Sequence, residues 1–259
     1  MKDKSFSTNK VRKSLLYWCC KPLGLKTFEY LLGRSDYGQT FVVSGVATSS
    51  KDRYESKIKE LAIKNGINVF SDEDIVAGEY DIGFCIGYPK KINTKTLNLC
   101  KEGVINLHFA PLPTYRGSGT LTHAIINEEK EYGVTLHLMD EKLDTGPIIL
   151  VQTIPLSKEK TAWEIIKDIE ALGFQVVVKN FTDLIMHTYE LKDQSEIIKR
   201  SGVKPQFCTK KSVDDLYNLD FNWEFDKVHR YLRALTLGKP KKPYFEQLGK
   251  RICLSLSED

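Results

Sequence analysis

Val104 to Arg116 reads V-I-N-L-H-F-A-P-L-P-T-Y-R, and this stretch indicates most directly how the chain folds. Asn106 and His108 alternate around a leucine at the end of an apolar run, and the two-residue period of a β-strand puts both side chains on one face. Pro111 and Pro113 then end the strand, because proline lacks a backbone N–H and biases the residue before it towards extended geometry. Open α/β sheets hold their ligands on such loops, at the carboxyl ends of strands.

A carboxamide beside an imidazole offers two groups that acyl transfer needs, a donor for a developing oxyanion and a base for the nucleophile. In a second motif, a strand from Val134 to Leu138 leads into an acidic loop and then into a strand from Ile148 to Thr153. Asp144 of this loop could orient the His108 ring, fix its tautomer and stabilise the imidazolium. For each residue alone a plainer interpretation stays open: Asn106 as a cap, His108 as a core histidine and Asp144 as a turn former.

Together the two motifs read N-x-H-x-x-x-L-P-x-Y-R-G and G-V-T-L-H-x-M-D-x-x-x-D-T-G-P-I-I. This pair resembles the signature of the folate-dependent formyltransferases, which pass a formyl group from N10-formyltetrahydrofolate to an amine. The resemblance runs roughly from Val11 to Ile252 and is strongest from Gly103 to Gln152. It implies that Asn106 stabilises the oxyanion, His108 is the general base and Asp144 is its carboxylate partner. It also implies N10-formyltetrahydrofolate as cosubstrate and no metal, because the formyl donor is already activated.

The resemblance further implies three binding segments. The folate contacts would come from Lys90, Lys91 and Ile92, and from the loop of Asp140, Glu141, Lys142 and Leu143 up to Asp144, whose backbone would hold the pterin. The entrance for the second substrate would be lined by Tyr115, Arg116, Gly117 and Ser118. Arg116 could contact a diphosphate, and a clamp on a nearby carbonyl or carboxylate is an equal alternative.

Composition describes an ordinary globular chain. The 38 basic and 34 acidic residues leave a net charge of +4, a weak excess that does not argue for a nucleic-acid partner. No apolar run approaches the roughly eighteen residues of a membrane helix. The six cysteines form no C-x-x-C and accompany no histidine pair at ligand spacing, which argues against a zinc site and for reduced, cytoplasmic thiols. Residues 1 to 12 read as a basic, frayed tail.

Strand and helix patterns alternate along the chain, which predicts a mostly parallel sheet with right-handed crossovers. With the resemblance, this predicts an α/β fold: a Rossmann-like formyltransferase core with a mostly parallel twisted sheet, plus a short C-terminal appendage. The first strand-to-helix turn lacks the glycine spacing of a dinucleotide site. The expected strands cover residues 14–20, 41–46, 68–70, 81–86, 104–108, 134–138 and 148–153, and the expected helices cover 25–32, 51–65, about 94–100 and a long segment after the capping box Thr161-Ala-Trp-Glu164.

Within that long helix, one stripe is expected to be core: Trp163, Ile166, Ile169, Leu172, Val176, Phe181 and Leu184. The composition changes after Pro205, which predicts a catalytic domain over residues 1–204 and a short C-terminal subdomain over 205–259. A segment this short is marginal alone, so it must pack on the core or on a second subunit.

The amine that accepts the formyl group is predicted from this tail. Methionyl-tRNA formyltransferases carry a full basic barrel after the linker, and glycinamide ribonucleotide formyltransferases end near the close of the first domain. Nucleotide-sugar N-formyltransferases combine the core with a short tail. The chain is therefore expected to formylate an amino-dideoxy sugar linked to dTDP or a similar nucleotide, in the cytoplasm and for lipopolysaccharide O-antigen biosynthesis. Ser118 stands where relatives acting on UDP-linked aminoarabinose carry arginine. The alternatives are a methionyl-tRNA or glycinamide ribonucleotide formyltransferase, or a non-catalytic folate or nucleotide-sugar binding protein, although all three catalytic residues are present.

The tail also carries many large apolar and aromatic groups: Phe207, Leu216, Tyr217, Leu219, Phe221, Trp223, Phe225, Tyr231 and Tyr244. Packing them on the first domain would leave a monomer, and packing some of them across a two-fold axis would give a dimer. The related sugar enzymes are typically dimeric, so a homodimer is predicted.

Overall fold

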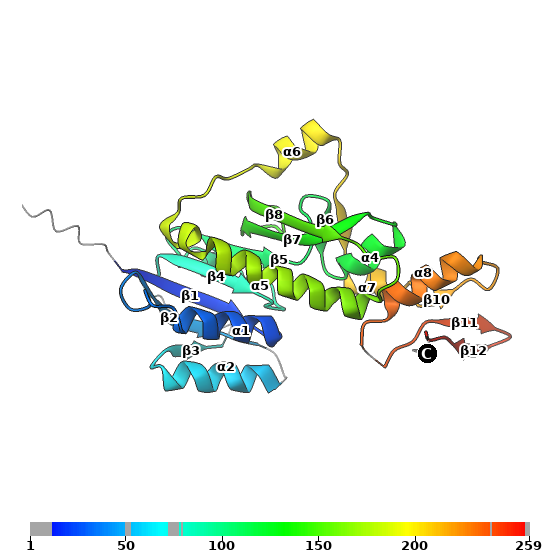
Figure 1. Ribbon diagram of the computed structural model, residues 1–259, viewed down its shortest axis with the longest axis horizontal. Coiled ribbons are helices and arrows are strands. Elements are labelled where there is room, and N and C mark those ends of the chain that lie inside the picture. Colours follow the sequence, from blue (N-terminus) through cyan, green and yellow to red (C-terminus); the bar gives the residue numbers. More distant parts are fainter. Residues whose placement is uncertain (1–11, 50–52, 72–77, 79, 239, 257–259) are drawn as a thin grey trace, which may run out of the picture. The chain divides into compact units, whose positions relative to one another are not determined.

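The computed structural model describes residues 12–49, 53–71, 78, 80–238 and 240–256 (Figure 1). The chain divides into two compact units, which are Met1–Ile105 with Phe181–Thr188, and Asn106–Asn180 with Tyr189–Asp259. Most of the predicted basic tail, residues 1–11, and the start of the helix predicted from residue 51 lie outside the described residues.

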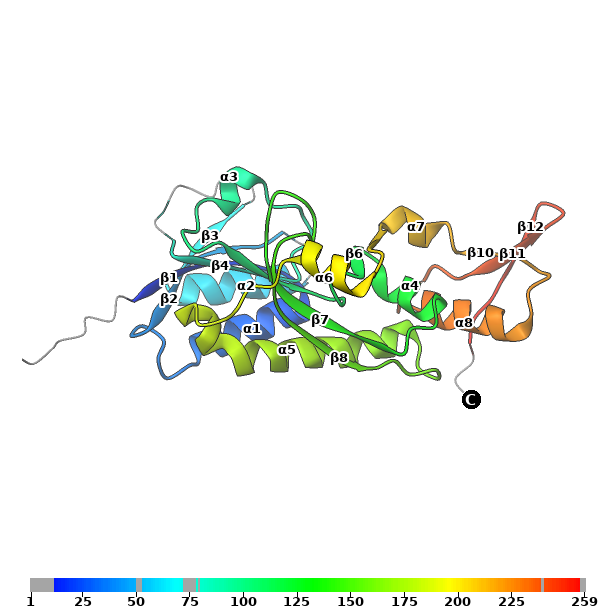
Figure 2. The same cartoon turned by 90° about the horizontal axis from the view of Figure 1, so that it is seen from above.

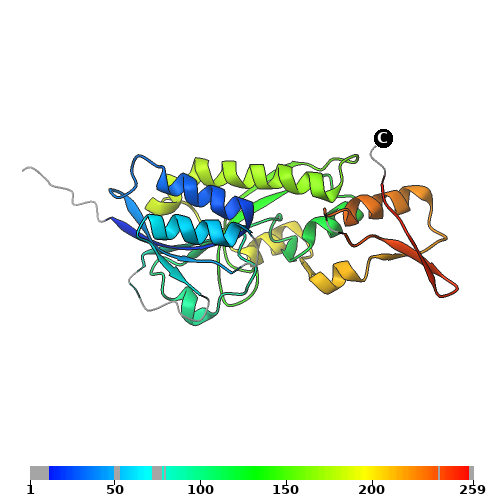
Figure 3. The same ribbon diagram turned by 90° about the horizontal axis from the view of Figure 1, so that it is seen from below.

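The first unit contains four parallel strands in the order β3-β2-β1-β4. The middle strand β1 is fully buried from Leu15 to Cys19, as expected for a strand that is covered on both faces of a parallel sheet. Its strands are β1 (Lys13–Cys19), β2 (Phe41–Ala47), β3 (Asn68–Phe70) and β4 (Ile82–Ile86), and its helices are α1 (Lys21–Leu32), α2 (Arg53–Lys64) and α3 (Thr94–Leu97). Helices α1 and α2 lie side by side (Figure 3).

Two local signals in this unit can be compared with the sequence. Gly66, two residues after the last residue of α2, has φ +66°, and it ends the helix close to the predicted residue 65 because only glycine adopts this left-handed conformation without strain. The helix predicted from Leu25 instead begins at Lys21. Pro22 fits the first helical turn, where its missing N–H would have had no partner anyway, so it does not delay the helix.

The large sheet has the strand order β3-β2-β1-β4-β5-β7-β8. Strand β5 (Val104–His108) begins in the first unit and ends in the second. Strands β7 (Glu131–Leu138) and β8 (Ile148–Pro155) form an antiparallel pair. The predicted α/β class with a mostly parallel sheet is confirmed, with β7 and β8 as an antiparallel pair at its edge.

The second unit also holds β6 (Tyr115–Gly117), α4 (Thr120–Ile126), α5 (Ala162–Met186, its last turn and a half in the first unit) and α6 (Gln194–Ser201). The capping box before α5 is confirmed: Thr161 N donates to Glu164 Oε2 over 2.8 Å and Glu164 N donates to Thr161 Oγ1 over 3.4 Å. The two side chains thus accept from backbone N–H groups that have no partner within the first turn of the helix.

The predicted core stripe of α5 is wrong at its start. Trp163 is 44% exposed, and Ile165 is buried in place of the predicted Ile166. Trp163 lies in the first turn, where its backbone N–H donates to Thr236 O over 2.9 Å and its indole ring covers Gly238. Later positions, Ile169, Val176, Phe181 and Leu184, are buried as predicted, whereas Leu172 is half-buried.

The C-terminal segment forms a small cluster of its own around Val213, Tyr217, Leu219 and Leu235. It comprises β9 (Gln206–Cys208), which pairs with β6, and α7 (Lys210–Asp214), β10 (Asn218–Leu219), α8 (Phe225–Leu235), β11 (Tyr244–Gln247) and β12 (Lys250–Cys253). Helix α8 lies beside α4 (Figure 2), and Thr122 Oγ1 donates to Ala234 O over 3.1 Å. The segment therefore packs on the rest of the second unit, while the domain boundary at residues 204/205 stays a prediction.

Candidate active site

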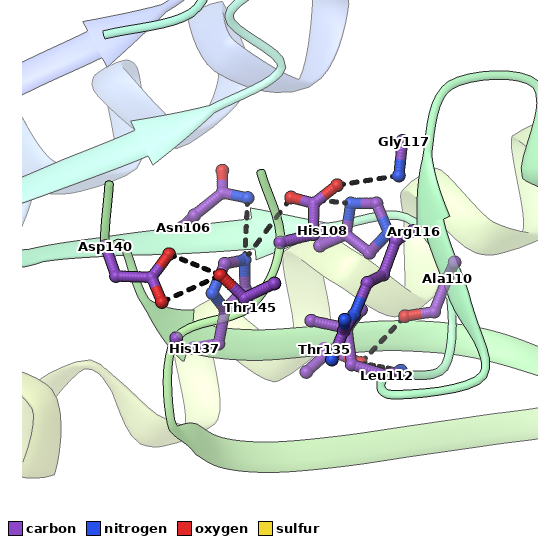
Figure 4. A network of polar contacts seen from close by, with 12 residues as sticks. Asn106, His108, Ala110, Leu112, Arg116, Gly117, Thr135, His137, Asp140 and Thr145 are labelled. Atoms are coloured by element: carbon purple, nitrogen blue, oxygen red, sulfur yellow. Dashed lines mark hydrogen bonds and ion pairs between the residues drawn. The ribbon is translucent and has the colours of Figure 1, made fainter. Parts of the chain in front are cut away.

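Strand β5 brings Asn106 and His108 to one face, as its alternation predicts (Figure 4). The residues between and before them, Val104, Ile105 and Leu107, are buried and anchor the strand in the sheet. His108 itself is 8% exposed, so its ring lies at the edge of the core and not in free solvent.

The backbone oxygen of Tyr115 fixes the tautomer of His108. It lies 3.0 Å from His108 Nε2, and because a carbonyl can only accept, Nε2 carries the hydrogen. In the neutral ring Nδ1 is then the basic atom. Asp144 Oδ1 lies 3.6 Å from that Nδ1, which is an electrostatic approach and longer than a hydrogen bond. The structure therefore adds Tyr115 as the orienting group and places Asp144 beside the basic nitrogen.

Asp144 is held in an unusual backbone conformation. It is 7% exposed and has φ +57°, in the left-handed region that non-glycine residues seldom adopt. Its Oδ2 accepts a hydrogen bond from Gly117 N over 2.8 Å, while its Oδ1 faces both His108 and His137 Nε2, the latter at 3.8 Å. Only glycine fits at position 117, because a Cβ there would come within 2.1 Å of the backbone oxygen of Cys208.

His137 on β7 is a member of the site to which the sequence analysis assigned no role. Its Nδ1 donates to Leu138 O over 2.8 Å, so the neutral ring accepts at Nε2, and Asn106 Nδ2 donates to Nε2 over 3.0 Å (Figure 4). The His137 pKa is lowered to about 4, mainly by burial and also by the neighbouring His108, while Asp144 opposes the shift. A neutral His137 therefore fixes the orientation of the Asn106 carboxamide. In the sequence, the place of His137 within the second motif was the signal that could have indicated this role.

The loop after β5 is tied to β7 by buried side chains. Thr135 Oγ1 accepts from Leu112 N over 3.0 Å and donates to Ala110 O over 2.7 Å (Figure 4). Tyr132 Oη donates to Phe109 O over 2.6 Å. The prolines end the strand, and these bonds then satisfy the backbone groups that leave the sheet.

The loop between β7 and β8 presents the second predicted folate segment. Asp140 accepts from Thr145 Oγ1 over 2.7 Å and from Lys142 N over 3.2 Å, which closes the loop on itself. The side chains of Glu141, Lys142 and Leu143 are exposed. The other predicted folate residues lie in the first unit, in the loop between β4 and α3, where Ile92 is buried and Lys90 and Lys91 are exposed. Their folate roles stay predictions.

The four residues predicted to face the second substrate differ in their burial and in the contacts they make. Tyr115 is buried, its Oη donates to Glu129 Oε1 over 2.7 Å, and burial raises its pKa. Ser118 is exposed, and its N–H donates to Cys208 O over 2.9 Å. Arg116 Nη2 donates to Gln194 Oε1 over 2.7 Å. Among the described residues the Arg116 guanidinium forms no ion pair with a carboxylate, and its buried Nε has no hydrogen-bond partner.

Two features, a metal-binding cluster and a membrane-spanning helix, are absent from the described part of the chain. Within it, no group of three or more His, Cys, Asp or Glu side chains is arranged to hold a metal ion. Within the same residues, no helix combines the length and apolarity needed to cross a membrane.

Comparison with known proteins gives the following matches. A family model described as formyl transferase matches residues 41–180. A curated relative from Azobacteroides pseudotrichonymphae, named methionyl-tRNA formyltransferase, is 34% identical over 139 residues, which are 54% of this chain and 42% of that protein. The chain spans about half the length of the curated relatives it matches.

Two solved structures share the fold over most of both chains. A sugar N-formyltransferase from Shewanella sp aligns with a TM-score of 0.77 at 19% identity, covering 96% of this chain and 98% of that one. An N-formyltransferase from Helicobacter canadensis, in complex with folinic acid and dTDP-3-aminofucose, aligns with a TM-score of 0.73 at 21% identity, covering 93% and 86%.

Proposed function

The chain belongs to the formyl transferase family, and we propose that it moves a formyl group from N10-formyltetrahydrofolate to the amine of a nucleotide-linked amino-dideoxy sugar, with dTDP as the nucleotide. The observation that carries the reaction type is the cluster of Asn106, His108 and Asp144: His137 holds the Asn106 amide, Tyr115 O holds His108 Nε2, and Asp144, bound by Gly117 N, lies 3.6 Å from His108 Nδ1. The cluster offers an amide donor, an imidazole and a carboxylate, the groups needed for acyl transfer to an amine.

The proposed chemistry follows from these atoms. The sugar amine attacks the formyl carbon, so a C–N bond forms while negative charge builds on the formyl oxygen. Asn106 has one N–H on His137 and a second N–H free to donate to that oxygen. His108 Nδ1 takes the proton from the amine nitrogen, and the resulting imidazolium faces Asp144 Oδ1 at 3.6 Å. The bond to N10 then breaks, and the proton passes to the departing tetrahydrofolate.

The folate part of the proposal rests on an exposed loop. The side chain of Asp140 closes the loop from Asp140 to Asp144, and Glu141, Lys142 and Leu143 are exposed, which leaves them open to contact with a flat heterocycle. Lys90 to Ile92 is proposed as the second folate segment on the resemblance alone.

The nucleotide part rests on Arg116. A guanidinium that is bound by a neutral amide keeps its full charge, and its planar fork matches diphosphate oxygens. The extent of the structural match supports the sugar class, because the alignment covers 98% of the Shewanella structure, which is described as a sugar N-formyltransferase. Methionyl-tRNA is the second candidate acceptor, because the curated relatives carry that name although the chain spans about half of them.

We also propose a homodimer that forms through the C-terminal segment. Phe221 and Phe225 are 65% and 76% exposed there, and Ile252 on β12 is 55% exposed. Apolar groups gathered at a surface are typical of interfaces. The cytoplasmic location and the role in O-antigen biosynthesis remain predictions of the same hypothesis.

The purified protein, incubated with N10-formyltetrahydrofolate and a panel of acceptors, tests the function. The panel holds dTDP-, GDP- and UDP-linked amino sugars, glycinamide ribonucleotide and initiator methionyl-tRNA. We expect formylation of a dTDP-linked amino sugar. Formylation of methionyl-tRNA with none of the sugars would replace the proposal by the second candidate.

A further inference from the structure

Gln194 is a buried polar residue to which the sequence analysis assigned no role. It is 3% exposed and is the first residue of α6. The helix does not need it as a cap, because Asp193 already accepts from Ser195 N over 2.7 Å and from Glu196 N over 3.2 Å. A buried amide is costly unless it is hydrogen-bonded, so its bonds indicate why it is there.

Gln194 makes three hydrogen bonds that together allow a single orientation. Nε2 donates to Gly146 O over 2.7 Å and to Asp144 O over 3.1 Å, and Oε1 accepts from Arg116 Nη2 over 2.7 Å. Carbonyls only accept and a guanidinium only donates. A flipped amide would oppose all three partners. A glutamate could accept from Arg116 but could not donate to the carbonyls, and a methionine could do neither.

On one side, Gln194 supports the backbone of Asp144. That residue holds φ +57° and is anchored at its carboxylate by Gly117 N and at its carbonyl by Gln194. The segment before α6 is itself fixed, because Lys192 and Ile148 exchange two backbone bonds of 2.8 Å. Gln194 therefore reaches Asp144 from a rigid base, and a left-handed aspartate persists only when its surroundings hold it.

On the other side, Gln194 aims Arg116 without neutralising it. A glutamate here would pair with the guanidinium and compete with an incoming anion, whereas the amide accepts one N–H and leaves the charge intact. Within the described residues this guanidinium has no carboxylate partner and its Nε has no bond, so the arrangement suits an anion such as a diphosphate.

We propose that Gln194 is a positioning residue that couples the anion-binding Arg116 to the catalytic Asp144, so that nucleotide binding and formyl transfer depend on one side chain. The coupling rests on the proposed function, because it takes the acceptor's diphosphate as the ligand of Arg116. Loss of the amide then has two separate effects, a weaker hold on the nucleotide and a misplaced carboxylate beside His108 Nδ1.

Steady-state kinetics of two variants separate these effects. Gln194→Glu keeps an acceptor for Arg116 but cancels its charge and repels the two carbonyls, so KM for the nucleotide sugar should rise about ten-fold and kcat should fall about ten-fold. Gln194→Met removes all three bonds and should lower kcat by at least as much. KM for the folate substrate should not change in either variant. The matched control is Gln152→Glu, the same change at an exposed glutamine of β8, which should behave as wild type.

Calorimetric titration with dTDP measures the Arg116 half without turnover, and Gln194→Glu should bind dTDP roughly ten-fold more weakly. If both Gln194 variants melt at lower temperature yet keep wild-type kcat, KM and dTDP affinity, the residue is purely structural and the proposal is overturned. If the wild type formylates another acceptor, the function proposal fails separately. An unchanged kcat of the variants on that acceptor would then overturn the coupling too, and a reduced kcat would support its Asp144 half.

Discussion

Asn106 Nδ2 donates a hydrogen bond to His137 Nε2 over 3.0 Å, and this contact determines which atoms of the carboxamide can meet a substrate. His137 accepts at Nε2 because its Nδ1 hydrogen is bound by Leu138 O over 2.8 Å. Protonation of Nε2 would set two donors against each other and turn the amide round. The neutral state of one buried histidine therefore keeps the proposed oxyanion donor in place.

Two substitutions of His137 should differ in activity because they restore different atoms. His137→Gln can place an oxygen near the position of Nε2 and accept from Asn106, whereas His137→Asn reaches only the position of Nδ1. The Asn variant should lose on the order of 10- to 100-fold in kcat, since the donor is no longer fixed, and the Gln variant should lose clearly less. Equal losses in two folded variants would argue against orientation through Nε2.

The stability of the protein should fall as the pH is lowered from about 6.5 to about 4. His137 has a folded pKa of about 4 against an ordinary histidine value of 6.5, so the unfolded chain binds more protons within this window and is favoured there. Burial is the main cause and His108 adds to it, while Asp144, Leu138 O and Asp140 act in the opposite direction. The loss should be on the order of a few kcal/mol.

Denaturant titrations at pH 7 and pH 5 measure this loss, and His137→Gln is the control. In that variant the pH dependence should shrink but not vanish, because burial also lowers the pKa of His123, which acts with the same sign. An identical pH dependence in wild type and variant would contradict the assignment to His137.

Removal of the proposed base should reduce turnover strongly. His108→Ala should lower kcat by roughly 10²–10⁴-fold, the usual contribution of a general base, with little effect on folate binding. Rapid-quench measurement of the formylated product gives the rate. Near wild-type turnover in this variant, with an unchanged circular dichroism spectrum, would remove His108 from the mechanism.

Light scattering at micromolar concentration tests the homodimer. The chain has a mass of 29.6 kDa, so a dimer should scatter with about twice that mass. Phe225→Glu, a charge at the first residue of α8, should shift the protein towards monomer. A wild-type mass near that of one chain would exclude the dimer.

The sequence was sufficient where a property depends on neighbours along the chain. The alternation of Asn106 and His108 and the capping box at Thr161 are both local, and both are confirmed. The start of α1 was predicted at Leu25, four residues late, although the first turn accepts Pro22. Trp163 was assigned to the core because its position in the stripe does not reveal that it covers Gly238.

The partners of the site depend on tertiary distance. His137 meets Asn106 because β5 and β7 share a sheet, and the motif contains both residues without indicating that they touch. Gln194 lies 50 residues from Asp144 in the sequence and follows a charged stretch that resembles a linker. Its role follows only from what its amide contacts in the folded chain.

The central claim is that this site transfers formyl from folate to the amine of a nucleotide sugar through Asn106, His108 and Asp144. The most direct measurement is mass spectrometry of a dTDP-linked amino sugar after incubation with N10-formyltetrahydrofolate and either wild type or Asn106→Ala. We expect the sugar to gain one CO unit with the wild type and the variant to be slower by roughly 10²–10³-fold, the usual loss of one oxyanion donor. The claim would be contradicted if the wild type formylated another acceptor but left the sugar unmodified. Equal rates for the wild type and Asn106→Ala would contradict it as well.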